Sequence, residues 1–87
     1  MSQQSGTRDH QHVAMYDLSP SAKLVFKTLE NEGRLTQKQL ANETFLVRRT
    51  VRSAIRQLEQ AGMITSRVNF EDARQDIYSP KEIQENR

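Results

Sequence analysis

Three successive segments of this chain carry apolar residues at helical spacing, and the spacing changes to strand-like alternation after Gly62. Of the 19 Leu, Ile, Val and Phe residues, 17 lie within residues 18–78, so this window holds the core. We therefore expect one domain over residues 18–79, preceded by a flexible polar tail over residues 1–17 and followed by a C-terminal tail over residues 80–87.

The first segment has the signals of a helix start and a helix stop. Ser19 is a candidate N-cap, and Pro20 suits the first helical position because its missing N–H has no partner to lose there. Gly33 supplies the C-terminal stop. One apolar stripe joins the residues at i, i+3, i+4 and i+7, namely Ala22, Val25, Phe26 and Leu29. Leu24 lies off this stripe.

The second helix opens at Thr36, where Gln39 completes a capping box three residues later. This helix is short, and its inward-facing residues are Leu40, Ala41 and Thr44. Phe45 and Leu46 follow as an apolar turn. Phe45 is a candidate for stacking on bases, but we expect it to pack against the core or its edge.

The third helix covers residues 47–61 and ends at Gly62. Its apolar stripe consists of Val47, Val51, Ala54, Ile55 and Leu58. At 100° per residue, the opposite side collects Arg49, Arg52, Ser53 and Arg56.

The last part of the domain has the pattern of a β-hairpin. Residues 63–68 and 76–78 are the predicted strands, and the polar residues 69–75 between them form a charged tip. Leu35 is a candidate for a third short strand. The predicted fold class is therefore α+β, mostly helical, with the order of a winged helix-turn-helix: three helices plus a β-hairpin wing.

The charge of the third helix suggests what this fold does. The whole chain has a net charge of only +2, but residues 44–60 contain four Arg and one Glu. An α-helix that enters the major groove of DNA needs donors for base edges and phosphates, and the planar guanidinium supplies both. The predicted major-groove residues are Arg48, Arg49, Thr50, Arg52, Ser53 and Arg56. Arg48 lies nearer the apolar edge, so we assign it a phosphate.

Other chemistries find little support in the sequence. The chain has no cysteine, and its two histidines, His10 and His12, both lie in the N-terminal tail without a third ligand type nearby. It has no Gly-rich phosphate loop and no plausible Ser/His/acid set. We therefore expect no enzyme, no cofactor and no metal. No apolar stretch is long enough to cross a membrane, and we expect a cytoplasmic protein.

Several runs resemble MarR-like winged-helix regulators, over roughly residues 18–79. These runs are LTQKQLA at 35–41, RRTV at 48–51, LEQAGMI at 58–64 and the wing element Asp72-Ala73-Arg74. The run LSPSAKLVFK at 18–27 looks most like small archaeal members. The resemblance implies a transcriptional regulator that binds double-stranded operator DNA.

In that family the wing Arg enters the minor groove and the Asp two residues before it holds that Arg in place. The resemblance therefore implies these roles for Arg74 and Asp72, and a narrow minor groove does attract an inserted Arg. The alternative for this pair is an ordinary ion pair at the hairpin tip. The predicted DNA-contacting residues of the wing are Arg67, Asn69, Asp72, Arg74 and Gln75.

The chain also departs from that family. The family usually has Gly in the turn and Ser or Thr as N-cap of the third helix, where this chain has Phe45 and Val47. Either Thr44 caps this helix or the turn is built differently. We expect this chain to have no counterpart of the family's additional N- and C-terminal helices, and therefore no effector pocket of the family's kind.

Without those helices, a homodimer would need another surface. Leu24, with Leu18 and Ile83, is a candidate for it, and the alternative is that Leu24 packs under its own N-terminal tail. Phe70 is an exposed candidate for stacking on bases. The competing function is a winged-helix module for protein contact, as an adaptor subunit of a larger assembly.

Overall fold

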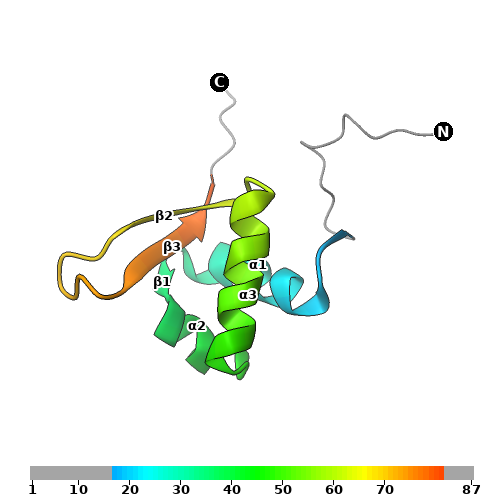
Figure 1. The fold of residues 1–87 in the computed structure, drawn as a ribbon, viewed down its shortest axis with the longest axis horizontal. Coiled ribbons are helices and arrows are strands. Elements are labelled where there is room, and N and C mark those ends of the chain that lie inside the picture. Colours follow the sequence, from blue (N-terminus) through cyan, green and yellow to red (C-terminus); the bar gives the residue numbers. More distant parts are fainter. Residues whose placement is uncertain (1–16, 82–87) are drawn as a thin grey trace.

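A computed structural model describes residues 17–81, which form three helices and a three-stranded antiparallel sheet (Figure 1). The elements are α1 (Pro20–Glu32), β1 (Leu35–Thr36), α2 (Gln37–Thr44), α3 (Arg48–Gln60), β2 (Ile64–Val68) and β3 (Asp76–Pro80). The strand order in the sheet is β1-β3-β2, so the predicted short strand at Leu35 exists and pairs with β3. The predicted fold class, three helices plus a hairpin wing, is confirmed.

The predicted caps set the ends of the first two helices. The Ser19 hydroxyl accepts a hydrogen bond from the Ala22 N–H at 3.1 Å, and Gly33 closes α1 with a φ of 95°. At α2, the Thr36 and Gln39 side chains each accept from the other residue's N–H, at 3.1 and 2.9 Å. These bonds satisfy backbone donors that a helix start leaves without intrahelical partners.

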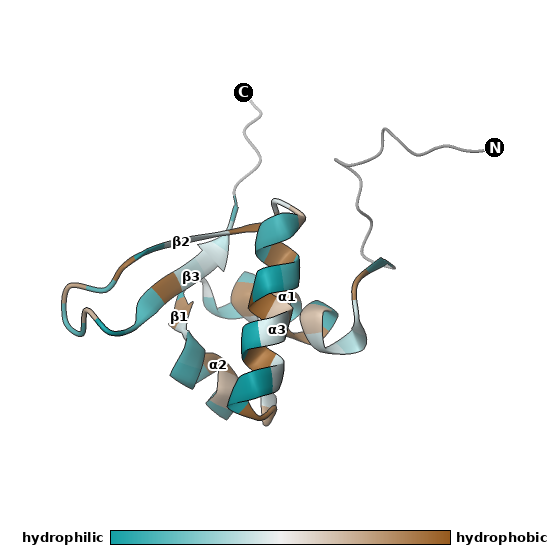
Figure 2. Cartoon of the chain, viewed as in Figure 1, coloured by the Kyte–Doolittle hydropathy of each residue, from teal (hydrophilic) through white to brown (hydrophobic). Residues whose placement is uncertain are grey.

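The core lies where the three helices meet the inner face of the sheet. Hydrophobic residues recur along α1 and α3 between hydrophilic ones, and those stripes face each other (Figure 2). The buried apolar residues are Leu18, Ala22, Val25, Leu29, Leu35, Leu40, Val51, Ala54, Ile55, Leu58 and Ile64. Leu18 is thus part of the core, and its assignment to a dimer surface is wrong. Leu24 is 42% exposed.

The turn between α2 and α3 differs from the prediction. Phe45 ends α2 in the left-handed conformation, with a φ of 63°, and is 91% exposed instead of packed on the core. Val47 lies outside α3 as its N-cap residue and is 66% exposed, so it does not belong to the apolar stripe. The left-handed residue redirects the chain, and both side chains therefore point to solvent.

Thr44 stabilises this turn but does not cap α3. Its hydroxyl donates to the Leu40 carbonyl at 2.7 Å and accepts from the Leu46 N–H at 3.2 Å. The start of α3 has no side-chain cap. The turn is therefore built differently from the family pattern, which was the second of the two alternatives.

The hairpin is longer at its C-terminal strand than predicted. Whereas β2 begins at Ile64, β3 continues through Ser79 to Pro80, and the Lys81 N–H donates to the Met63 carbonyl at 2.9 Å. The predicted strand ends at Tyr78, and Pro80 lies in the predicted C-terminal tail. Pairing with β2 nevertheless extends to the pair Ile64–Pro80.

Candidate nucleic-acid interface

The outward side of α3 carries the predicted arginine face. Arg49, Arg52, Ser53 and Arg56 are exposed and together line a shallow hollow of about 200 Å³. Their common position follows from the burial of Val51, Ala54, Ile55 and Leu58 on the other side of the helix. The prediction that these four polar residues share one face is confirmed. Thr50 is half-buried at the margin of this face.

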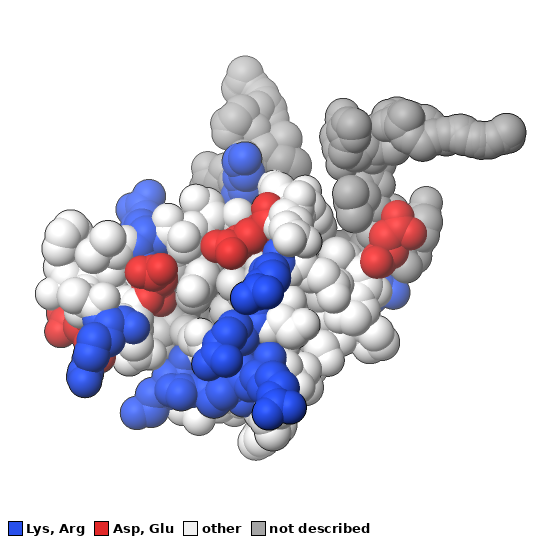
Figure 3. All heavy atoms as spheres, viewed as in Figure 1, with Lys and Arg blue, Asp and Glu red and all other residues white. Residues whose placement is uncertain are grey.

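A second hollow, of about 460 Å³, lies between α3 and the wing. Arg48 and Arg52 line it from α3, and Arg74 and Gln75 line it from the wing. Arg52 borders both hollows, so the helix and the wing present one continuous polar surface, which we call the basic face. Figure 3 shows Lys and Arg side chains along α3 and from its lower end across to the wing, with acidic side chains above this row and at the tip of the wing.

Asp72 organises the tip of the wing. One oxygen of its carboxylate accepts from the Arg74 backbone N–H at 3.1 Å and from the Arg74 Nε at 3.2 Å. Its other oxygen accepts from the Gln75 amide at 3.3 Å. The Asp72 side chain is 30% exposed and that of Arg74 is 90% exposed. Asp72 therefore holds the backbone and the guanidinium Nε of Arg74, while most of that side chain faces solvent.

These hydrogen bonds hold the pKa of Asp72 below its ordinary value of 3.8, with the Arg74 side chain as the largest cause. Tyr78, which lines the hollow between α3 and the wing, has a raised pKa, chiefly because burial disfavours the phenolate. Both groups are thus in their usual protonation states at neutral pH, Asp72 ionised and Tyr78 neutral.

The two remaining predicted wing residues, Arg67 and Asn69, do not line the hollow between α3 and the wing. Arg67 pairs with Ile77, whereas Tyr78 pairs with Ser66. Because successive residues of a strand point to opposite faces, Arg67 lies on the sheet face opposite Tyr78, away from the arginines of α3. The Asn69 side-chain oxygen accepts from the Glu71 N–H at 3.0 Å, so it shapes the hairpin tip.

The structure adds residues that the prediction missed. Gln37, Asp76 and Tyr78 line the hollow between α3 and the wing. The alternation within residues 76–78 would have placed Asp76 and Tyr78 on one face, but it did not show which face. No local pattern indicates another contact, in which the Gln57 side-chain oxygen accepts from the Ser19 N–H at 3.0 Å and connects α3 to the start of α1.

No group of three or more metal-ligating side chains occurs within residues 17–81. His10 and His12 lie outside the described residues, as does Ile83. None of the three helices in the described range has the length and hydropathy to cross a membrane.

The family comparison decides what kind of domain this is. The model of the winged helix-turn-helix DNA-binding family matches residues 18–65, which is more than half of the chain. The chain belongs to this family. Among curated protein sequences, none matches the chain.

Solved structures of MarR-family and other transcription regulators share this winged-helix fold. The adhesin competence repressor AdcR from Streptococcus pyogenes is 25% identical, with a TM-score of 0.68, over 75% of this chain and 48% of that chain. AbfR, solved in its reduced form bound to DNA, is 25% identical with a TM-score of 0.69, over 77% of this chain and 47% of that chain. YusO from Bacillus subtilis is 23% identical with a TM-score of 0.70, over 75% of this chain and 46% of that chain.

This winged-helix chain spans about half the length of the regulators that it matches. The similarity thus covers the winged-helix part of those proteins. The expected likeness to small archaeal members stays a prediction.

The hydrogen bonds at the wing tip generate a prediction about pH. A pKa lowered by folding means that the carboxylate of Asp72 stabilises the folded wing at neutral pH, and that this contribution is lost as the pH falls through the folded-state pKa. We expect the Asp72 carboxyl to titrate below 3.8 in an NMR pH titration. Arg74→Ala should raise this pKa because it removes the side-chain donor.

A matched variant separates the two side-chain donors. Gln75→Ala removes a smaller contribution, so it should raise the Asp72 pKa less than Arg74→Ala does. An Asp72 pKa at or above 3.8 in the wild-type protein would contradict the role assigned to this carboxylate.

Proposed function

We propose that this chain is a sequence-specific, double-stranded DNA-binding transcription regulator, with α3 in the major groove and Arg74 in the adjacent minor groove. The observation that carries the proposal is the basic face, on which Arg52 connects the outward face of α3 to the hollow shared with the wing. AbfR, which shares this fold, was solved bound to DNA. The function is thus one of binding and not of catalysis.

The major groove supplies a natural partner for α3. It is about 12 Å wide and admits one helix, whose N-terminal half contacts base edges in helix-turn-helix proteins. Arg49, Arg52 and Arg56 follow one another along the exposed side of α3, and guanidinium groups pair bidentately with guanine. Ser53, between them, is short enough to let the helix approach closely. We assign Arg48, which faces the wing, to a phosphate.

The wing supplies the minor-groove contact. Arg74 is extended from a tip that Asp72 fixes through two hydrogen bonds, so the guanidinium is presented with part of its freedom already lost. A narrow minor groove concentrates negative potential and attracts such an Arg. Gln75, held by the same carboxylate, borders the hollow at the base of the tip.

The arginines of α3 provide the direct test. In the variant Arg49→Ala/Arg52→Ala/Arg56→Ala, affinity for a duplex selected from a random pool should fall at least about 100-fold, since each bidentate contact is worth about 1–3 kcal/mol. Fluorescence anisotropy measures the affinity. The three side chains are exposed, so the fold should persist, and circular dichroism checks it.

A control variant changes the charge equally on another surface. Arg34→Ala/Arg67→Ala/Lys81→Ala also lowers the net charge by three but leaves the basic face and α1 intact, and it should change the affinity only a few-fold through the long-range field. Equal losses of affinity in both variants would mean that binding is a non-specific electrostatic attraction, and would contradict the proposed role of α3. An unchanged affinity in the triple variant, together with a stoichiometric protein partner, would favour the adaptor function.

We also propose that two copies associate through α1, where Leu24 is 42% exposed. Such a dimer would bind two half-sites about 34 Å apart. Sedimentation equilibrium should give twice the chain mass of 10.1 kDa for the wild type and the single chain mass for Leu24→Glu. Leu24→Met, which keeps the apolar surface, should remain dimeric. A monomeric wild type at high concentration would contradict this proposal.

A further inference from the structure

One face of the three-stranded sheet carries no buried residue, and the C-terminal end of α1 lies beside it. The register places Thr65 opposite Ser79, and Arg67 opposite Ile77, and partners directly opposite each other share a face. This face is the reverse of the one that carries the buried Leu35 and its partner Tyr78. We call it the outer wing face and define it by Arg34, Thr65, Arg67, Ser79 and Lys81.

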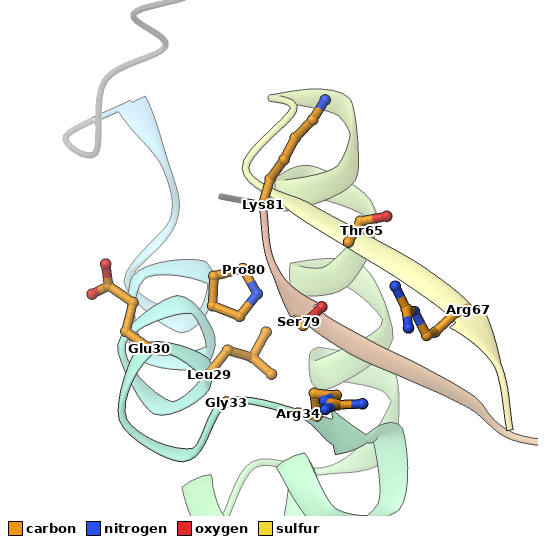
Figure 4. A pocket seen from close by; sticks show the side chains of 9 residues that line it. All are labelled: Leu29, Glu30, Gly33, Arg34, Thr65, Arg67, Ser79, Pro80 and Lys81. Atoms are coloured by element: carbon orange, nitrogen blue, oxygen red, sulfur yellow. The ribbon is translucent and has the colours of Figure 1, made fainter. Parts of the chain in front are cut away.

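The outer wing face is hollowed along its length. A hollow of about 670 Å³ is lined by all five of these residues, and Figure 4 shows the Arg34 and Arg67 guanidiniums at one end of it and the Lys81 side chain at the other. Arg34 and Arg67 also line a neighbouring hollow of about 500 Å³, which continues to Asn69 and Phe70 at the wing tip. The surface therefore runs from the base of the wing to its tip.

The cations of this surface are not paired with acidic side chains of the described residues 17–81. Within residues 17–81, neither Arg34, Arg67 nor Lys81 forms an ion pair within 4.0 Å. Two acidic side chains border the hollows. Glu30 is paired with Lys27 on α1 at 3.6 Å and points away from the two guanidiniums in Figure 4, and Glu71 lies at the tip. An anionic partner would supply the missing charge.

The chemistry of the lining favours phosphate groups in a row. Guanidinium, ammonium and hydroxyl groups, here with Thr65 and Ser79 as the hydroxyl donors, are the side chains that contact nucleic-acid phosphates. Strands of five residues span about 17 Å. A polyanion matches a surface of that length, while one small anion would contact only part of it. The lining residues are largely exposed, as suits a backbone that passes over them.

We propose that the outer wing face binds the phosphate backbone of a second DNA duplex while the basic face holds the first. The inference rests on the proposed function, because the first duplex must occupy α3 and Arg74. Arg67 lies on the reverse side of the sheet from the hollow between α3 and the wing, so a duplex on the basic face leaves the base of the wing uncovered. One domain thereby holds two DNA segments together.

A two-duplex capture experiment on the full chain tests this inference. One duplex of about 30 base pairs is fixed on beads, and retention of a second, fluorescent duplex is measured after protein is added. We expect retention by the wild type and an approximately fivefold or greater loss with Arg34→Gln/Arg67→Gln, because each lost phosphate contact weakens a binding mode driven by counterion release. Lys23→Glu, which lowers the net charge by the same two units on α1 and leaves the Lys27–Glu30 pair intact, should retain the second duplex.

Anisotropy with a single short duplex separates the two proposals. Arg34→Gln/Arg67→Gln should bind one duplex nearly as well as the wild type, because its basic face is intact. If the wild type binds one duplex but does not capture a second, or if the double variant captures it fully, the outer wing face is not a DNA site and the proposed function stands. A parallel loss of single-duplex affinity would place both arginines on the first duplex and overturn the inference. If the wild type binds no duplex at all, the proposed function fails as well.

Discussion

The packing of α3 against α1 and α2 is the interaction on which the rest of the structure depends. Val51 and Leu58 are completely buried in this contact, and Ala54 and Ile55 nearly so. Because a helix has a fixed angular period, burying one side determines which residues face outward. The arginine face is therefore a consequence of the core, and a rotation of α3 would bury guanidinium groups at a high cost in solvation.

Strand pairing in the sheet determines how the wing is oriented relative to α3. Pairing of β3 with both β1 and β2 fixes which residues of the hairpin point toward α3 and which point outward. Tyr78 and Asp76 thus face α3, while Arg67 faces the other side. At the tip of the wing, where no core residue holds the chain, the hydrogen bonds to the Asp72 carboxylate hold it instead. These hydrogen bonds connect folding of the tip with the presentation of Arg74.

Local sequence signals predicted most of the fold. The differences between prediction and structure come from contacts between segments that are distant in the sequence. Caps and apolar periodicity located the helices and the shared face of Arg49, Arg52 and Arg56, because both act within a few residues. Phe45 and Val47 were misplaced because the left-handed turn depends on how α2 and α3 meet. The face of Arg67 depends on strand register, and the contact between Gln57 and Ser19 joins distant segments, so periodicity could reveal neither.

The central claim is that α3 and the tip of the wing contact one duplex through a single continuous surface. Chemical-shift mapping by NMR, with a short selected duplex added to the labelled full chain, tests it most directly. We expect the largest amide shifts at the first two turns of α3 and at residues 72–75, with small shifts along α1. Large shifts confined to α1, or an unperturbed wing together with an unperturbed α3, would contradict it.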